Sequence, residues 1–218
     1  MALLIGVVSQ KGGVGKSTLA RVIAREYAAG GWNVKIADLD LSQSTSFNWQ
    51  ARRLSNGATP QVAVEQFASV ADARKVAAHY DLIVFDGAPH ATTATLEIAR
   101  VSHFLILPTG LALDDLEPTI RLAHELVKNG IPAGKITLAL CRIGDSPAEL
   151  DEAKAYVKRA GYSLLPGAIP DRTAYRRASD VGRTLTETPF PSLNQRAEEL
   201  AQAVINRVDK LTKLEGAA

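Results

Sequence analysis

Short apolar runs alternate along the chain with longer segments whose apolar residues recur at helical spacing. The runs lie at 3–8, 34–37, 61–65, 82–85, 104–107 and 136–140, with a weaker one at 163–165. Runs of this length are typical of buried strands, whereas helical spacing marks 17–29, 70–79, 116–129, 147–160 and 193–211. The alternation predicts an α/β fold, a mostly parallel, twisted sheet of about seven strands with helices on both faces.

The length and the apolar content are those of a single domain. With 218 residues, 46% of them hydrophobic, the chain can bury one sizeable core, and no linker or repeat divides it. We expect the domain to cover residues 1–212 and residues 213–218 to form a disordered tail. The single cysteine, Cys141, lies in an apolar run and is interpreted as core filler, because one cysteine forms neither a disulfide framework nor a metal cluster.

The segment after the first run carries the clearest chemistry. It reads Gln10-Lys11-Gly12-Gly13-Val14-Gly15-Lys16-Ser17-Thr18 and leads directly into a predicted helix. Glycines let the backbone approach phosphates closely, successive amides form an anion-binding nest, and the positive end of the helix adds attraction. Lys16 is then placed for the β- and γ-phosphates and the Ser17 hydroxyl for Mg²⁺. Residues 11–18 therefore predict a phosphate-binding loop for a nucleoside triphosphate.

This loop departs from the standard pattern G-x-x-x-x-G-K-[ST], because Gln10 replaces the first glycine and Lys11 adds a second lysine. The run K-G-G-V-G-K-S, followed by Asp38 and Asp40 at the end of the next predicted strand, resembles the deviant Walker A motif of the ParA/MinD family of ATPases. Gln10 resembles the residue that the ParA branch of the family carries at this position. Over about residues 2–212 the chain resembles the small ParA proteins of plasmid or chromosome partition, which lack an N-terminal DNA-reading domain.

The resemblance implies ATP and Mg²⁺ as ligands. It implies that Lys16 contacts the phosphates, that Lys11 crosses to the nucleotide of a partner subunit, and that Asp40 orients the attacking water. The implied metal-site residues are Ser17, Asp38, Asp40 and Asp86, the last as the Walker B carboxylate before Gly87. ATP is then held between the subunits of a homodimer, with slow hydrolysis that a partner protein accelerates. Because the carboxyl ends of parallel strands meet at one edge, these side chains are expected to converge.

Base recognition is assigned to Arg142, after the run at 136–140, and to Pro170, after the weak last run. In the resembling family a polar residue precedes the arginine, whereas Cys141 stands here. We favour adenine as the base because the chain has no clear N-K-x-D guanine motif. The loop after Asp40 also departs from the family pattern, since no proline stands at 41 and Gln43 comes one residue late.

Charge is locally uneven although the formal net charge is only +2. Seven basic residues lie between 154 and 183, and four are predicted to contact DNA phosphates: Arg172, Arg176, Arg177 and Arg183. No helix-turn-helix or aromatic-interleaved reader is evident, so the predicted binding is non-specific. The resemblance implies that the ATP-bound dimer holds nucleoid DNA until a centromere-binding protein of the ParB type, or a cargo adaptor, stimulates hydrolysis.

The expected location is cytoplasmic and nucleoid-associated. The N-terminus lacks the basic region of a signal peptide, and no apolar run approaches a membrane span in length. The final helical segment mixes acidic and basic residues, which favours docking on the core over membrane binding. Two alternatives remain open: a ParA-like ATPase that positions a protein cargo, such as a chemoreceptor cluster or a microcompartment, and a P-loop kinase acting on a small molecule.

Overall fold

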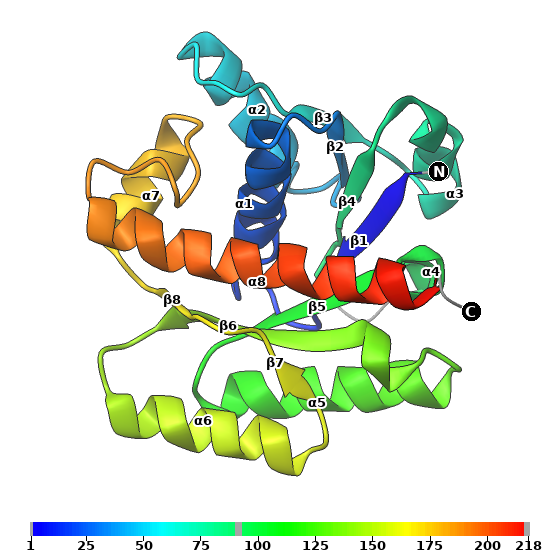
Figure 1. The fold of residues 1–218 in the computed structure, drawn as a ribbon, viewed down its shortest axis with the longest axis vertical. Helices are drawn as coiled ribbons and strands as arrows, with labels where there is room; N and C mark the ends of the chain where they lie inside the picture. The colour runs from blue at the N-terminus through cyan, green and yellow to red at the C-terminus, as the bar shows by residue number, and fades with distance from the viewer. Residues whose placement is uncertain (1, 90–92, 216–218) are drawn as a thin grey trace.

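A parallel sheet forms the centre of the structure, a computed structural model that describes residues 2–89 and 93–215, with only the backbone of 212–215 (Figure 1). Within these residues the sheet has eight strands in the order β3-β2-β4-β1-β5-β6-β7, with β8 paired to β6. The strands are β1 Leu3–Val7, β2 Val34–Asp38, β3 Ala63–Gln66, β4 Leu82–Asp86, β5 Phe104–Thr109, β6 Ile136–Ile143, β7 Ser163–Leu164 and β8 Ile169–Pro170. Their pairings are parallel, as predicted.

Helices cover both faces of this sheet, which confirms the predicted α/β class. They are α1 Lys16–Ala29, α2 Thr45–Ser55, α3 Val70–Lys75, α4 Thr93–Val101, α5 Leu113–Lys128, α6 Pro147–Arg159, α7 Thr173–Asp180 and α8 Pro191–Glu215, with 3₁₀ turns η1 Ala77–His79 and η2 Ala133–Lys135. The helices α1, α2, α7 and α8 pack into the core on one face, and α3, α4, α5 and α6 into the core on the other (Figure 1).

Alternation along β1 shows how a continuous apolar run serves both cores. Ile5 and Val7 belong to the core under α1, whereas Leu4 belongs to the core under α4 and α5. Gly6 also faces the second core, where an added Cβ would lie only 2.6 Å from a methyl group of Ile98. Successive residues of a strand point to opposite faces, so a strand that is buried on both faces is apolar along its whole length and does not alternate apolar with polar residues.

Several boundaries differ from the sequence prediction. The pattern gave no helix range for α2, α4 or α7 and no strand at β8, and it predicted one helix at 70–79, where α3 and η1 are separate. In α2 only three residues are buried, among them Trp49, so most of its length carries no apolar signal. The last helix continues to Glu215, so residues 213–215, predicted to lie in a disordered tail, are helical. Residues 216–218 lie outside the described residues.

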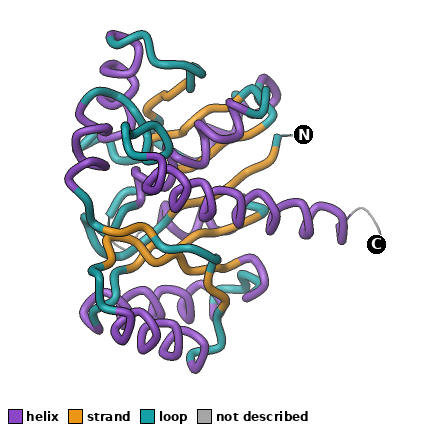
Figure 2. The backbone as a smooth tube through the Cα atoms, turned by 60° about the vertical axis from the view of Figure 1, so that its left-hand side comes forward, coloured by secondary structure: helices purple, strands orange, loops and turns teal. Residues whose placement is uncertain are grey.

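The apolar stripe of α8 packs on the core, as predicted. Leu200 and Val204 are fully buried and Val208 is 3% exposed. The last turns of the helix extend beyond the rest of the fold (Figure 2). Over residues 2–89 and 93–215, none of the helices combines the length and the apolar character that crossing a membrane requires.

The strand register brings three predicted site segments to one edge. Val7, the last residue of β1, pairs with Asp86, and Asp38, the last residue of β2, pairs with Asp86 from the other side. The loop at 10–15 follows β1 directly. Ligands of open α/β sheets bind beyond the carboxyl ends of the strands, so this edge is the place to look for a site.

Candidate functional site

The loop between β1 and α1 has the backbone of a phosphate cradle. Gly13 and Gly15 have φ of 75° and 106°, a region that residues with a Cβ rarely adopt. A Cβ on Gly15 would also lie 3.3 Å from the Cβ of Cys141, on β6 below the loop. Cys141 is 2% exposed, and burial raises the pKa of its thiol to about 12, which agrees with its predicted place in the core. Glycine is therefore required where α1 begins and its amides point toward the loop.

Lys16 spans the inside of this loop. Its Nζ donates hydrogen bonds to Ser9 Oγ at 3.2 Å and to the carbonyl of Lys11 at 3.1 Å, and the residue is 8% exposed. Burial lowers the pKa of Lys16, while the nearby carboxylates of Asp86 and Asp40 oppose that shift. An ammonium held among oxygen acceptors beside a helix N-terminus is placed to neutralise phosphate charge.

Asp86, at the end of β4, has one buried oxygen without a hydrogen-bond partner. It is 2% exposed; Oδ2 accepts a 2.7 Å hydrogen bond from Ser46 Oγ, whereas Oδ1 has no partner among the described residues. Burial raises the pKa of Asp86 to about 6 and the Asp38 carboxylate raises it further, while the nearby side chains of Ser46, Ser17 and Arg21 oppose the shift. A Mg²⁺ ion with its water shell would supply the missing hydrogen-bond partner of such a buried carboxylate oxygen.

Asp38, at the end of β2, is engaged by the backbone of the following loop. Oδ1 accepts from the amide of Asp40 at 3.1 Å, and Oδ2 accepts from the amides of Ser46 and Phe47 at 3.0 and 3.1 Å. The residue is fully buried, and burial raises its pKa. These contacts make Asp38 the support of the loop and of the first turn of α2, and the metal role predicted for it stays a prediction.

Asp40 is half-buried and organises the turn that follows it. Its Oδ1 accepts hydrogen bonds from Ser42 Oγ at 2.6 Å and from the amide of Gln43 at 3.1 Å. No proline is needed for this turn, since the Asp40 carboxylate accepts from the hydroxyl two residues on and from the backbone amide three residues on. The carboxylate remains beside the phosphate loop, where a water-orienting group is expected.

A cavity of about 650 Å³ joins the loop to α7, a volume suited to a small ligand. Among the described residues that line it are the predicted site residues Gly12, Gly13, Gly15, Lys16, Ser17, Thr18, Asp40, Arg142, Pro170, Arg172, Arg176 and Arg177. Five predicted residues lie outside its lining: Lys11, Val14, Asp38, Asp86 and Arg183. Val14, Asp38 and Asp86 are buried.

A family profile described as the CobQ/CobB/MinD/ParA nucleotide binding domain matches residues 5–185. The chain belongs to this family. It is a ParA/MinD-type P-loop protein, which confirms the family that residues 10–18 suggested. A search of curated protein sequences gave no match.

Solved structures share its fold at low identity. MinD of Pyrococcus horikoshii with Mg-ADP superposes with a TM-score of 0.74 at 19% identity, over 94% of this chain and 96% of that chain. McdA of Cyanothece with ATP gives 0.71 at 16%, over 93% and 96%. A protein assigned to plasmid partition in Borrelia burgdorferi, bound to AMPPNP, gives 0.70 at 16%, over 95% and 100%.

The residues of this ParA/MinD-type site fit a nucleotide with Mg²⁺. Within the described part of the chain no cluster of three Asp, Glu, His or Cys side chains could hold a metal ion alone. Mg²⁺ commonly keeps several waters and binds through one or two carboxylates together with substrate phosphates. Ser17 lines the cavity and Asp86 presents its unpartnered oxygen, so these two residues would hold the ion, through water at Asp86.

The second lysine of the loop pairs with a distant helix. Lys11 Nζ lies 2.7 Å from Oδ1 of Asp115, in the first turn of α5, and the two side chains are 43% and 28% exposed. The carbonyl of Lys11 accepts from Ser9 Oγ at 2.7 Å. Lys16 is thus the internal lysine of the loop and Lys11 the external one.

Arg142 clamps the phosphate loop from β6. Its guanidinium donates to the carbonyl of Gly13 at 2.6 Å and lies 3.6 Å from the carboxylate of Asp171. Its φ of 55° is left-handed, a conformation that costs a non-glycine residue about 1 kcal/mol or more. The side chain lines the cavity beside Pro170, so both residues predicted to flank the base lie at the same place.

The predicted DNA-binding arginines lie on and beside α7. Arg176 and Arg177 are exposed on the helix, Arg172 precedes it, and Arg183 is exposed three residues after its end. Arg172 pairs with Asp145 and Arg176 with Asp171. Arg172, Arg176 and Arg177 line the cavity and Arg183 does not, and the role of these cations toward DNA stays a prediction.

Two residues that the sequence did not single out connect Asp86 to α7. Ser46 donates to Asp86 and accepts a 3.2 Å hydrogen bond from Nε of Arg21, which lies on α1. The only signal in the sequence is the place of Arg21 within the apolar stretch Leu19 to Ile23 of the first helix, where a charged side chain needs a buried partner. Ser46 was not singled out because it lies on α2, a helix that the sequence pattern did not predict.

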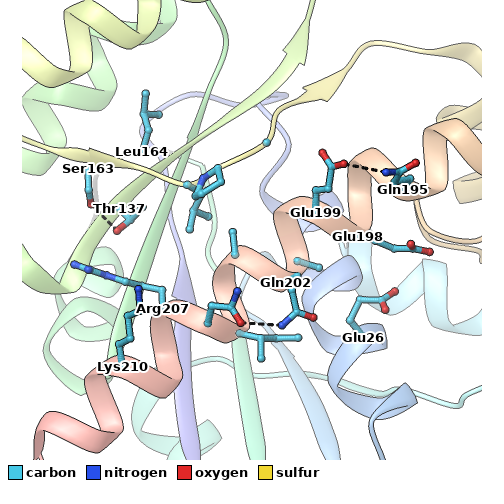
Figure 3. A pocket seen from close by; sticks show the side chains of 17 residues that line it. Glu26, Thr137, Ser163, Leu164, Gln195, Glu198, Glu199, Gln202, Arg207 and Lys210 are labelled. Atoms are coloured by element: carbon cyan, nitrogen blue, oxygen red, sulfur yellow. Dashed lines mark hydrogen bonds between the residues drawn. The ribbon is translucent and has the colours of Figure 1, made fainter.

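A larger cavity lies elsewhere among the described residues. It measures about 930 Å³ and opens between α8 and β7, with Glu198 and Glu199 toward one end and Arg207 and Lys210 toward the other (Figure 3). None of the predicted site residues lines it. Volume therefore does not identify the nucleotide site; the glycine backbone, Lys16 and the unpartnered oxygen of Asp86 do.

Proposed function

We propose that this ParA/MinD-type protein is an ATP-dependent switch for DNA partition. ATP is held between two subunits, the dimer binds DNA non-specifically, and hydrolysis stimulated by a centromere-binding protein of the ParB type releases it. Cargo is thereby moved or spaced within the cytoplasm on the nucleoid.

The contrast between the two loop lysines carries this proposal. Lys16 is buried and lines the cavity, whereas Lys11 is 43% exposed and lies outside the lining. A lysine outside its own pocket, yet five residues from the phosphate-binding lysine, is placed to reach a nucleotide in a second subunit. The pairing with Asp115 is exposed and therefore weak, so it does not prevent such a movement.

Hydrolysis follows from positioning and charge neutralisation rather than covalent chemistry. Asp40 lines the cavity and would orient water toward the γ-phosphate. Lys16 would neutralise charge that develops on the phosphate oxygens. When bound, Mg²⁺ would polarise the β- and γ-phosphate oxygens, held by Ser17 and, through water, by Asp86. The reaction is expected to be slow in the isolated protein.

Phosphate contacts from Arg172, Arg176, Arg177 and Arg183 would supply sequence-independent, salt-sensitive affinity for DNA. Two copies of the arginine set in one dimer raise the avidity without any new contact. The similar fold of a protein assigned to plasmid partition supports this role. A MinC:MinD complex of Aquifex aeolicus, of the same fold, supports regulation through a bound partner protein.

Size by light scattering tests the proposal. The Asp40→Ala variant, which should not hydrolyse ATP, is measured with ADP and with ATP and Mg²⁺, each with and without random-sequence duplex DNA; Asp40→Asn is the matched variant that keeps an oxygen acceptor for the turn. A dimer and salt-sensitive DNA binding with ATP alone would support the switch. A monomer that ignores both ligands would overturn it, and a phosphorylated small-molecule product would then favour a kinase.

A further inference from the structure

A chain of three hydrogen bonds runs from the nucleotide site to α7. Ser46 Oγ donates to Asp86 Oδ2 at 2.7 Å, Arg21 Nε donates to Ser46 Oγ at 3.2 Å, and Arg21 NH1 donates to Ser179 Oγ at 3.2 Å. Asp86 ends β4, Arg21 lies on α1 and Ser179 lies on the last turn of α7. One guanidinium therefore links the carboxylate that would hold the metal's water shell to the helix with the predicted DNA-binding arginines.

The burial of Arg21 in this position is energetically unfavourable. The residue is 5% exposed, its NH2 has no hydrogen-bond partner, and within the described residues it forms no direct ion pair. The hydrogen-bonded path from Arg21 to the Asp86 carboxylate runs through the Ser46 hydroxyl. The guanidinium carbon lies 5.6 Å from the ring centre of Trp49, but burying an incompletely paired charge is unfavourable, and replacing such a group by an apolar residue of similar size is often neutral or stabilising.

Ser179, at the far end of these three hydrogen bonds, lies on a helix that packs closely against α2. The Ser179 carbonyl accepts from Arg52 Nε at 3.4 Å, and Trp49 Nε1 donates to the carbonyl of Arg183 at 3.1 Å. Gly182, just after α7, packs so closely on α2 that an added Cβ would lie 2.1 Å from the amide nitrogen of Arg53. A displacement of Ser179 thus moves α7 and its arginines together with α2.

We propose that Arg21 is a positioning residue that couples the Asp86 carboxylate to α7, so that the nucleotide state sets the placement of the DNA-binding arginines. The inference rests on the proposed function. Ser46 has a single hydroxyl proton, which it gives to Asp86, and Arg21 is held against the same oxygen. When the carboxylate turns toward a different partner, Ser46 and Arg21 must follow, and Ser179 follows Arg21.

The test compares Arg21→Gln and Ser179→Ala with the wild-type chain. The affinity for a random-sequence DNA duplex is measured with saturating ADP-Mg²⁺ and with saturating AMPPNP-Mg²⁺, and the ratio of the two affinities is the readout. Couplings between sites commonly change affinity by about 5- to 150-fold, so we expect each variant to lose at least about fivefold of the wild-type ratio. Because Arg21 and Ser179 also line the cavity, the affinity of each variant for AMPPNP is measured without DNA first, and the ratio is then taken at nucleotide concentrations that saturate that variant.

Arg25→Gln is the matched control, because Arg25 lies one turn later on α1 and contacts Glu26 and Glu187 instead of Ser46 and Ser179. It should keep the wild-type ratio. A merely structural role for Arg21 would lower the melting temperature and leave the ratio intact, which would overturn the inference. If Arg21→Gln does not fold, Ser179→Ala decides, since it removes only one hydroxyl. Wild-type protein that binds DNA equally with both nucleotides would overturn the proposed function itself.

Discussion

Lys11 and Asp115 form an ion pair within one subunit, with Nζ 2.7 Å from Oδ1 and a separation of 104 positions along the sequence. The lysine that the family resemblance assigns to a partner's nucleotide is therefore occupied in the single chain. Exchange of Asp115 for a phosphate requires this pair to open. Asp115 therefore competes for Lys11 with the nucleotide of the partner subunit in the proposed dimer.

Asp115→Asn should strengthen nucleotide-dependent dimerisation. An exposed pair contributes about 0–1 kcal/mol, so the dissociation constant of the AMPPNP-bound dimer should fall by up to about fivefold. Sedimentation equilibrium measures it. Asp114→Asn, in the same first turn of α5, is the control and should have no effect. A weaker dimer in Asp115→Asn would mean that Asp115 supports the interface instead of competing for Lys11.

Lys11→Ala should bind AMPPNP normally and fail to dimerise, since its side chain lies outside the nucleotide cavity. Lys16→Ala, which removes the buried ammonium, should lose nucleotide binding. Calorimetric titration and light scattering on the same samples separate the two effects. Normal dimerisation of Lys11→Ala with nucleotide would show that the lysine does not cross the interface.

Nucleotide binding should depend on pH through Asp86, whose pKa burial raises to about 6. Because the folded state holds this proton more tightly than the unfolded state, the contribution of Asp86 to stability is present at low pH and is lost as pH rises through about 6. Mg²⁺-dependent affinity for AMPPNP should change in the opposite sense and fall below about pH 6. Titrations with and without Mg²⁺ between about pH 5 and about pH 8 test this. Asp86→Asn should lose the Mg²⁺-dependent difference at every pH.

Gly182→Ala should strongly destabilise the fold. Gly182 has φ of 73°, and an added Cβ would lie 2.1 Å from backbone of α2. We expect a loss of about 3 kcal/mol or more in the free energy of unfolding. Gly161→Ala is the matched control, because its φ of 84° is similar but the space around it is open, so it should cost only about 1 kcal/mol. Urea denaturation compares them, and equal losses would show that the contact with α2 yields easily.

Arg176→Ala combined with Arg177→Ala should weaken DNA binding; both side chains also line the cavity, so DNA affinity is compared at saturating AMPPNP. Removing two phosphate contacts should reduce the slope of log affinity against log salt by about 2. The control pair Arg121→Ala with Lys128→Ala removes two exposed cations from α5, on the other face of the sheet. An unchanged slope in the α7 variant would place the DNA surface elsewhere.

Much of the nucleotide site could be predicted from the sequence because its information is local. The phosphate loop needs only its glycines, Lys16 and Ser17 between one strand and one helix. Asp38 and Asp86 follow from a general property of parallel sheets, whose carboxyl ends share an edge. The apolar runs predicted the fold class for the same reason, since strands buried on both faces need continuous apolar sequence.

The remaining relationships depend on pairings that no local pattern encodes. Lys11 meets Asp115 across 104 residues and Arg21 meets Ser179 across 158. These contacts exist because the strand order brings α5 beside the phosphate loop and because Gly182 allows α7 to pack on α2. A charged residue within an apolar helical stretch predicts that its side chain has a polar partner in the core. Which partner it finds, and whether Asp38 turns toward a metal or toward the backbone of its own loop, is decided only when distant surfaces pack together.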